Sequence, residues 1–269
     1  MNGPTPITFS FGENWQAFLR TMPADALARA LADSQHWLSN QQVAGKSIAD
    51  LGCGSGLHSL VFLQRGAARI HSLDSDPRSV TATRGLWEQA GRPAQWTVDA
   101  GSVLDAALIG RLGSEQFDIV YSWGVLHHTG AMWQAIDHAC SLVKPGGLLW
   151  ISLYAKGPQY AYDLALKQRY NAASAFGKRM LAWRFVLRVM YARLRRVRNP
   201  FAWNEGKARG MDTWHDIVDW LGGLPYEVAS VEEVVAVVGA RGFSLKQVEP
   251  APEGSCHVFL FQADVVVGR

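Results

Sequence analysis

The chain has 269 residues, of which 48% are hydrophobic and 18% charged, so it can bury a sizeable core and is not a disordered tail. Its net charge of +3 conceals an uneven distribution, because residues 156–210 contain 13 Lys and Arg side chains and only two acidic ones. Three widely spaced cysteines exclude a disulfide framework and a CxxC metal site. No apolar run approaches the ~20 residues that span a bilayer, and the N-terminus lacks the segments of a secretory signal. We therefore expect a cytoplasmic protein.

A helical lead-in is expected over residues 1–45, and a regular alternation begins at residue 46. Short apolar runs, each a predicted strand, occupy residues 47–51, 69–74, 94–99, 117–122 and 148–154. Stretches long enough for helices lie between them at residues 56–66, 77–90 and 131–143. Strands that alternate with helices indicate βαβ units and a parallel sheet, and several continuously apolar runs are typical of strands covered on both faces. The sequence KPGG at residues 144–147 predicts a helix stop and a turn.

This alternation breaks after the fifth strand. Residues 155–230 contain no clear strand and are predicted to be a helical insertion, after which residues 231–242 read as a helix that Gly242 closes. Residues 243–249 and 256–264 then predict an antiparallel hairpin. The expected fold is α/β: a Rossmann-like, seven-stranded, mostly parallel sheet with helices on both faces, a C-terminal antiparallel hairpin and a helical insertion after strand 5. Residues 46–154 and 231–269 would form its core.

A glycine-rich turn is the most informative feature of the sequence. In IADLGCGSGLHSL (48–60), an apolar strand ends near Asp50, glycines follow at positions 52, 54 and 56, and a helix begins near residue 57. Such a turn lets a ligand approach the backbone and the helix N-terminus, unless the turn serves only to pack. The second strand ends in Asp74, whose carboxylate suits ribose hydroxyls. The spacing GxGxG differs from the dinucleotide pattern GxGxxG, and Asp50 favours a cationic ligand over a pyrophosphate, so a nicotinamide-dependent oxidoreductase is disfavoured.

Further motifs follow in a recognisable order. They are DLGCGSG (50–56), LDSDP (73–77), GSVLD (101–105), FDIVYSWGVLHHTG (117–130) and LVKPGGLLWISLY (142–154). With these motifs, residues 46–154 resemble the class I S-adenosylmethionine-dependent methyltransferases. Three more stretches resemble a bacterial subgroup of the 3-demethylubiquinone methylase type. They are FSFGENWQAFL (9–19), SWGVLHHTGAMWQAI (122–136) and RGMDTWHDIVDWLGG (209–223).

The resemblance implies S-adenosylmethionine as the cofactor and assigns residues to it. Asp50, Gly52, Cys53, Gly54 and Gly56 would form the turn beneath its methionine and ribose parts, Asp74 would hold the ribose hydroxyls, and Ser75 would lie near adenine. The segment with Gly101 and Ser102 departs from the commoner GD pattern, because Ser102 stands where an aspartate would meet adenine. Whether Asp99 or Asp105 compensates is left open. Trp15 in the lead-in would shield the cofactor from water.

The segment after the fourth strand carries the candidate chemistry. Trp123, His127 and His128 follow a strand's carboxyl end, where open α/β sheets bind ligands. Trp123 could pack on the cofactor, and a histidine could remove a proton from the acceptor. Adjacent side chains on a helical turn diverge by about 100°, so we expect at most one of the two histidines to face the acceptor. A base is optional, because methyl transfer depends strongly on alignment. No metal site is predicted, since two adjacent imidazoles are too few ligands.

The insertion contains a basic amphipathic helix over residues 177–198. Its apolar face could pack on the core, contact an anionic membrane surface, or help to bind an anionic or lipid-linked acceptor; nucleic acid is the least favoured partner. The apolar face is formed by Met180, Trp183, Leu187, Met190, Tyr191 and Leu194. The cluster that follows includes His215, which together with Asp216 or Asp219 could supply the base, or could be part of a structural cap.

The sequence thus predicts an enzyme that transfers a methyl group to oxygen or nitrogen of a small molecule or of a glycan or lipid precursor. It would act in the cytoplasm, free or bound peripherally at the inner membrane. An RNA or protein methyltransferase that binds its polymer through the basic insertion is the alternative, and a non-catalytic cofactor-binding scaffold is the second. The acceptor and the oligomeric state are not predicted.

Overall fold

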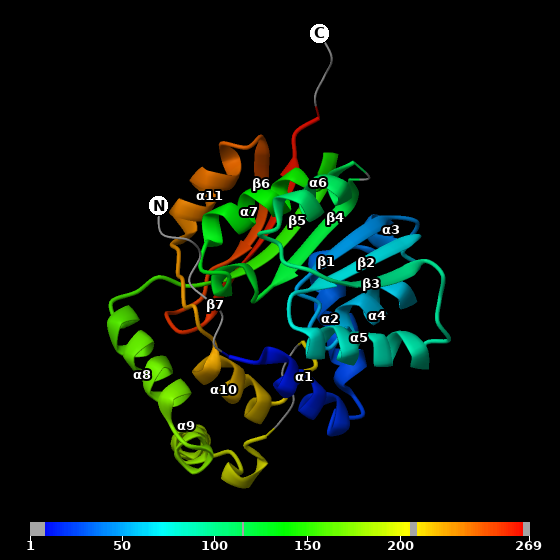
Figure 1. The fold of residues 1–269 in the computed structure, drawn as a ribbon. Helices are drawn as coiled ribbons and strands as arrows, with labels where there is room; N and C mark the ends of the chain where they lie inside the picture. Colours follow the sequence, from blue (N-terminus) through cyan, green and yellow to red (C-terminus); the bar gives the residue numbers. More distant parts are fainter. Residues whose placement is uncertain (1–8, 115, 205–208, 266–269) are drawn as a thin grey trace.

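A seven-stranded sheet forms the centre of the computed structural model, which describes residues 9–114, 116–204 and 209–265 (Figure 1). Strands β1 to β5 are parallel, and β7 is antiparallel to both of its neighbours. In spatial order the strands are β3 (Trp96–Ala100), β2 (Arg69–Asp74), β1 (Ser47–Leu51), β4 (Phe117–Trp123), β5 (Val143–Tyr154), β7 (Cys256–Ala263) and β6 (Phe243–Glu249). The predicted mostly parallel sheet and its C-terminal hairpin are confirmed.

Helices cover both faces of this sheet, as predicted. On one face, α2 (Ala26–Trp37), α3 (Asn40–Val43), α4 (Leu57–Gln64) and α5 (Pro77–Gln89) contribute to a core cluster around Phe62 and Trp150. On the other face, α6 (Ala106–Gly113), α7 (Met132–Ser141) and α11 (Val231–Gly239) pack against β4, β5 and β7. The sequence did not indicate α6, because this helix has only eight residues and two of them are glycines.

The KPGG segment was only partly predicted. Helix α7 does end just before it, at Ser141, but the expected turn is wrong, because β5 already begins at Val143. The register against β4 moves from Phe117 opposite Val143 to Ile119 opposite Leu148, so residues 144–147 form an irregularity inside the strand. Gly146, with φ of +76°, supplies the left-handed backbone conformation that this irregularity needs.

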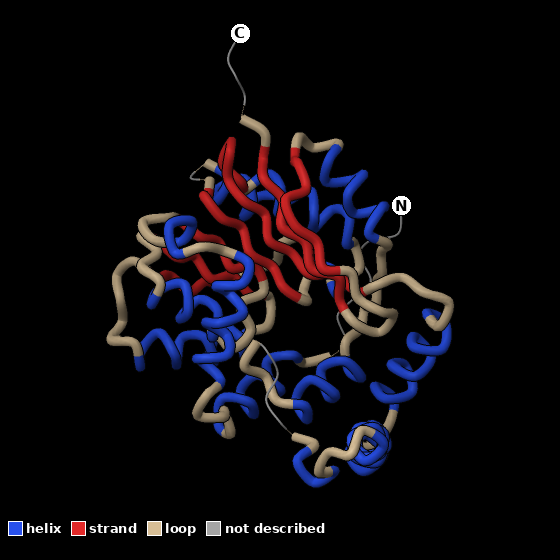
Figure 2. The backbone as a smooth tube through the Cα atoms, turned by 180° about the vertical axis from the view of Figure 1, so that it is seen from behind, coloured by secondary structure: helices blue, strands red, loops and turns tan. Residues whose placement is uncertain are grey.

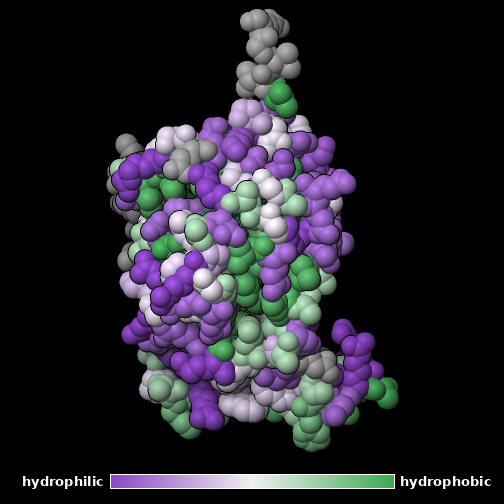
Figure 3. Space-filling view, turned by 90° about the vertical axis from the view of Figure 1, so that its right-hand side faces the viewer, coloured by the Kyte–Doolittle hydropathy of each residue, from purple (hydrophilic) through white to green (hydrophobic). Residues whose placement is uncertain are grey.

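The remaining helices lie beyond the carboxyl ends of the parallel strands (Figures 1 and 2). They are α1 (Phe11–Arg20), the short η1 (Leu126–His128), α8 (Tyr160–Ala172), α9 (Ala175–Arg195), the short η2 (Pro200–Ala202) and α10 (Thr213–Gly222). The predicted helical insertion after strand 5 is confirmed. Seen from the side that carries α5 and β3, the surface mixes hydrophilic and apolar side chains (Figure 3). Within residues 9–114, 116–204 and 209–265, no helix has both the length and the apolar character needed to cross a membrane.

Helix α9 does not turn its predicted apolar face to the core. It buries Leu181, Ala182 and Val186 against α8 and α10 instead. Five of the six residues predicted for the apolar face are exposed, and only Met190 is partly buried. The interpretation that this face packs on the core is therefore wrong, because the apolar side chains of α9 exceed what α8 and α10 can cover.

Helix α1 is fastened to the start of α5 by a close backbone approach. The Gly12 N–H donates to Asp76 Oδ2 at 2.8 Å, and Asp76 also caps α5 through the Arg78 N–H. A Cβ at position 12 would lie 2.5 Å from the Ser79 backbone nitrogen and 2.7 Å from Asp76 Oδ1. Only glycine fits this junction, so Gly12 fixes where α1 lies relative to the sheet.

We expect Gly12→Ala to destabilise the protein by about 1–3 kcal/mol, because the added methyl overpacks a backbone contact. Gly85, on α5, is the matched control, since a Cβ there meets nothing within 4 Å. Gly85→Ala should stabilise the protein by about 0.5–1 kcal/mol through helix propensity. Denaturant unfolding followed by circular dichroism measures both, and equal effects of the two substitutions would contradict the assigned role of Gly12.

Candidate functional site

A cavity of about 490 Å³ opens at the carboxyl edge of the sheet, within the size range of small-molecule sites. The ends of β1, β2, β3 and β4 form its floor, α1 forms one wall, and residues 209–219 contribute another. Most of the predicted site residues line it: Trp15, Asp50, Gly52, Cys53, Asp74, Ser75, Gly101, Ser102, Trp123 and His128. Gly54, Gly56, His127 and His215 are not among the lining residues.

The glycine-rich turn runs directly under this cavity. Gly52 and Gly54 have φ of +79° and +55°, a conformation that favours glycine. A Cβ at position 54 would lie 2.8 Å from the indole of Trp15, so α1 packs closely on the turn. Gly56 caps α4, and the Thr83 side chain packs against it. Gly54 and Gly56 therefore shape the turn, whereas Gly52 and Cys53 face the cavity.

Asp74 and Asp50 are held in place by hydrogen-bond donors from the turn and from the starts of helices α4 and α5. Asp74 Oδ2 accepts from the Gly54 N–H and Oδ1 accepts from the Asp76 N–H, both at 2.9 Å. Asp50 Oδ2 accepts from the Ser59 hydroxyl at 2.5 Å. Burial raises the pKa of Asp74 to about 6. Burial also raises the pKa of Asp50 to about 7, and the negative charge of Asp74 raises it further. Both carboxyls would be ionised more readily beside a positively charged ligand.

The third strand brings a serine rather than a carboxylate to the cavity. Ser102 lines it, and its hydroxyl accepts from the Leu104 N–H at 3.1 Å. Asp105 instead caps α6 by accepting from the N–H groups of the next helical turn. Asp99 lies 3.6 Å from His71 with a largely exposed side chain. Neither carboxylate lines the cavity, so neither is placed to compensate for Ser102.

The rings of the two adjacent histidines contact each other, with centroids 4.5 Å apart, but only His128 is among the residues that line the cavity. His128 lines the cavity, and its Nδ1 lies 2.5 Å from the carbonyl oxygen of Pro225, which fixes the ring proton on Nδ1. His127 packs on Tyr154, and its Nδ1 accepts from the Tyr154 N–H at 3.1 Å. Burial, together with the Lys167 cation, lowers the pKa of His128 to about 3. His128 is therefore a neutral hydrogen-bond acceptor at Nε2, and a weak base.

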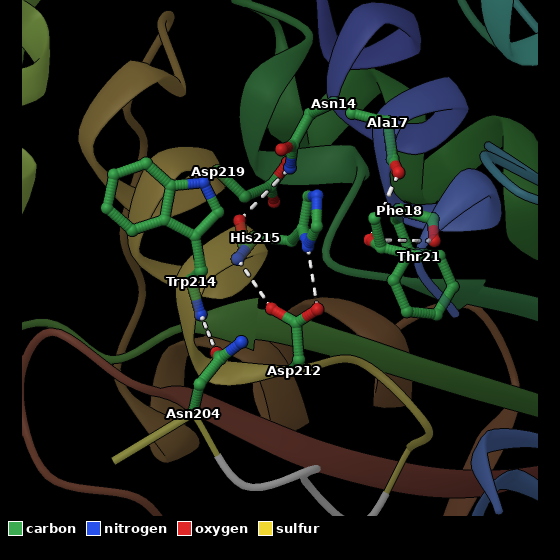
Figure 4. A network of polar contacts seen from close by, with 9 residues as sticks. All are labelled: Asn14, Ala17, Phe18, Thr21, Asn204, Asp212, Trp214, His215 and Asp219. Carbon is green, nitrogen blue, oxygen red and sulfur yellow. Dashed lines mark hydrogen bonds and ion pairs between the residues drawn. The ribbon is translucent and has the colours of Figure 1, made fainter. Parts of the chain in front are cut away.

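His215 belongs to the network of polar contacts that Figure 4 shows. Its Nδ1 lies 2.8 Å from Asp212 Oδ2, and its backbone N–H donates to Asp212 Oδ1. Burial acts to raise the pKa of Asp212, but the hydrogen bonds from His215 outweigh it and hold this pKa below its usual value. Asn14 of α1 donates to the His215 carbonyl at 3.0 Å. The network joins α1 to α10, while the imidazole itself does not line the cavity.

Sequence reasoning missed Arg209 as a lining residue and understated Asp219. The Arg209 guanidinium lies 3.4 Å above the Trp123 ring and donates to the Tyr121 hydroxyl at 2.8 Å. Asp219, on α10, also lines the cavity, and burial and the nearby Asp216 raise its pKa to about 7. His58 lines the cavity as well, stacked on Tyr121. Arg209 and Asp219 both lie in the stretch RGMDTWHDIVDWLGG (209–223), but that stretch does not indicate which of its side chains reach the cavity; the fold of the insertion brings these two to the sheet edge.

Carboxyl groups dominate the charge of the cavity. Among the lining residues that the structure describes, Asp50, Asp74, Asp76 and Asp219 face a single guanidinium, that of Arg209. Once ionised, these groups give the cavity a net negative charge, which suits a cationic ligand and opposes a pyrophosphate. Across the described part of the chain, no group of three or more His, Cys, Asp or Glu side chains is placed to hold a metal ion.

We expect the stability of the unliganded protein to fall as pH rises from about 4 to about 7. The pKa of Asp219 is raised on folding, so the folded state binds the proton more tightly, and this contribution is lost as pH rises through about 7. Asp219→Asn removes the cost of the buried charge. The variant should match the wild type near pH 4 and exceed it by about 4 kcal/mol at pH 8. Urea unfolding at both pH values tests this expectation; a difference that does not change with pH would contradict it.

Comparisons with known proteins agree with the motif order. Residues 48–147 match the family described as methyltransferase domain. A ubiquinone biosynthesis O-methyltransferase of Methylobacterium sp. (strain 4-46) is 31% identical over 148 residues, which are 55% of this chain and 54% of that protein. A ribosomal protein L11 methyltransferase of Pseudomonas aeruginosa (strain LESB58) is 32% identical over 117 residues, 43% of this chain and 36% of that protein. The chain thus spans about half or less of these curated relatives.

Two solved structures share the fold over nearly the whole chain. A magnesium protoporphyrin IX methyltransferase from Synechocystis PCC 6803 with bound SAH has a TM-score of 0.56 at 14% identity, covering 94% of this chain and 93% of that one. An O-methyltransferase family protein from Burkholderia thailandensis has a TM-score of 0.55 at 17% identity, and the match covers 94% of this chain and 59% of that one. At these identities the likeness concerns the fold.

Proposed function

We propose that this protein transfers the methyl group of S-adenosylmethionine to oxygen or nitrogen of a small molecule, a proposal that the match of residues 48–147 to the family described as methyltransferase domain supports. One observation carries the proposal: the four aspartates and single arginine of the cavity, placed at the carboxyl edge of the sheet. A negatively charged cavity stabilises a sulfonium and an ammonium group, both of which this donor carries. A pyrophosphate cofactor would meet repulsion there.

Within this proposal, each wall of the cavity has a part in holding the cofactor. Asp74 receives the ribose hydroxyls, Asp50 and Gly52 lie along the methionine part, and Ser75, Gly101 and Ser102 border the adenine. Gly54 and Gly56 act indirectly, by shaping the turn. Residues 1–8 of the lead-in lie outside the described residues; the remainder, residues 9–45, covers the cofactor through Trp15, whose indole already lies against Gly54. Trp123, under the Arg209 guanidinium, borders the reacting end.

The proton chemistry is proposed to rest on Asp219 more than on a histidine. When bound, S-adenosylmethionine would supply a methyl group: the acceptor lone pair would form a bond to the methyl carbon as the carbon–sulfur bond breaks, so that S-adenosylhomocysteine leaves and the acceptor releases a proton. A group with a pKa near 7 accepts such a proton best at neutral pH, and Asp219 has that pKa. His128, with its pKa lowered to about 3, would accept a hydrogen bond at Nε2 and orient the acceptor. His127 and His215 are proposed to have structural roles.

The acceptor is proposed to be small and, at its far end, anionic. The cofactor and the acceptor share one cavity of about 490 Å³, which leaves limited room for the second molecule. The insertion, residues 155–230, would provide the acceptor-side wall through Met211 and Asp219. Arg209 offers a charge for a carboxylate or phosphate of the acceptor. An RNA or protein substrate would need a broad groove leading to the cavity, whereas α1 and α10 both border it.

The test is an acceptor screen with S-adenosylmethionine labelled at its methyl group. Phenols, catechols, carboxylated amines and hydroxy acids are incubated with the protein, beside total RNA and a protein extract treated identically. The proposal expects acceptor-dependent label in a small product and stoichiometric S-adenosylhomocysteine, detected by mass spectrometry. Label transferred to RNA or protein would contradict it. Cofactor binding without turnover on any acceptor class would favour the scaffold alternative.

A further inference from the structure

Helix α9 carries an apolar stripe that is largely exposed, with Trp183 at its edge also packed against Trp203 and Trp214. The stripe residues are Phe176, Met180, Trp183, Leu187, Tyr191 and Leu194, spaced by three or four along the helix, so they share one face. Phe176 is 75% exposed, and Leu187, Tyr191 and Leu194 are each about 60% exposed. The opposite face of α9 holds Leu181, Ala182 and Val186 in a core with α8 and α10. Exposed apolar stripes of this length mark interaction sites.

Cationic side chains border this stripe. Helix α9 contains six Lys and Arg residues and no acidic residue. Arg184 and Arg188 also line a shallow pocket between α8 and α9, with Arg169 of α8 and the apolar side chains of Leu166 and Phe185. The pocket therefore combines three guanidinium groups with apolar lining side chains. This pairing of charge and apolar surface suits a phosphate headgroup with its acyl chain.

We propose that the α9 stripe docks the protein on an anionic lipid bilayer, with α9 lying in the plane of the interface. Its apolar side chains would enter the acyl boundary, Trp183 and Tyr191 would sit at headgroup level, and the arginines would bind lipid phosphates. A second copy of the chain fits the stripe poorly, because a two-fold contact would bring the same cationic helix against itself. The proposal does not depend on methyl transfer.

Docking would also place the cavity close to the membrane. Helix α10 packs against both α8 and α9, and its Asp219 lines the cavity. Helix α1 in turn joins α10 through Asn14. The stripe and the cavity wall are thus connected through one packed layer of helices below the sheet (Figure 1).

The experiment is vesicle flotation of the full chain with phosphatidylcholine alone and with phosphatidylcholine containing phosphatidylglycerol. Binding is expected only with the anionic lipid. Leu187→Ala with Tyr191→Ala should lower the partition coefficient about tenfold or more through lost apolar burial. Arg184→Ala with Arg188→Ala should lower it about 25-fold at low ionic strength, or about fivefold for each arginine. All four side chains are exposed, so the variants should fold.

Matched controls lie on the other side of the molecule. Val265→Asp replaces an exposed apolar residue outside α9, and Arg84→Ala with Arg92→Ala removes two exposed charges near α5; both variants should bind like the wild type. Three outcomes would overturn the proposal: no binding to anionic vesicles, binding that the stripe variant leaves unchanged, or a dimer in light scattering that the stripe variant dissociates. Inorganic phosphate at millimolar concentration should not displace the protein; displacement would assign the arginines to a free anion instead.

Discussion

Replacing Asp74 with alanine is expected to weaken binding of S-adenosylhomocysteine about 100-fold or more. The carboxylate is proposed to accept both ribose hydroxyls, and hydrogen bonds to a charged group contribute about 1.5–3 kcal/mol each. Its two oxygens are already oriented by the N–H groups of Gly54 and Asp76, so the ligand meets a preformed acceptor. Isothermal titration calorimetry measures the change.

Asp99→Ala is the matched control, because this carboxylate lies in the neighbouring strand β3 and does not line the cavity. It should leave the affinity unchanged. Thermal unfolding of both variants separates lost binding from lost folding. Equal affinities for the Asp74→Ala variant and the wild type would remove Asp74 from the cofactor site and weaken the case for this cavity.

Replacing Asp219 with asparagine is expected to lower kcat for methyl transfer by about 100-fold or more, with affinity for S-adenosylhomocysteine nearly unchanged. Loss of a general base typically lowers a rate by about 10²- to 10⁴-fold. The kcat of the wild type should rise with pH through an apparent pKa near 7, because Asp219 must be ionised to take the proton. This limb of the pH profile should disappear in the variant.

Asp216→Asn is the control on the same helix, since Asp216 does not line the cavity. Its charge helps to raise the pKa of Asp219, so its removal should keep activity and move the pH limb to lower pH. An Asp219→Asn enzyme with normal kcat and an unchanged pH limb would contradict the assignment and return the role of base to His128 or to the solvent.

The sheet was predictable because its signals are local. Each parallel strand is a short apolar run between turn residues, and β1 and β2 begin and end where the sequence places them. The glycine turn was predictable for the same reason, since Gly52 and Gly54 adopt backbone conformations that favour glycine. The KPGG segment shows the limit of this reasoning. Its residues favour a turn, but they form an irregularity inside β5, because β5 pairs with β4 and β7.

The polar residues of the site were harder to predict because burial changes their chemistry. The sequence favoured a histidine as base, since an unperturbed imidazole titrates near neutral pH. In the fold, burial lowers the pKa of His128 to about 3 and raises that of Asp219 to about 7. Asp219 is therefore better suited than His128 to accept a proton at neutral pH. Arg209 could not be placed from its neighbours in sequence. The apolar face of α9 was visible, but its exposure depends on how α8 and α10 pack.

The central claim is that the acidic cavity at the sheet edge binds an adenosyl sulfonium cofactor. The most direct measurement is calorimetric titration of the purified protein with S-adenosylmethionine and S-adenosylhomocysteine, with NAD as a parallel ligand. We expect saturable one-to-one binding of both adenosyl compounds and no heat of binding with NAD. Binding of NAD alone, or of none of the three, would contradict it.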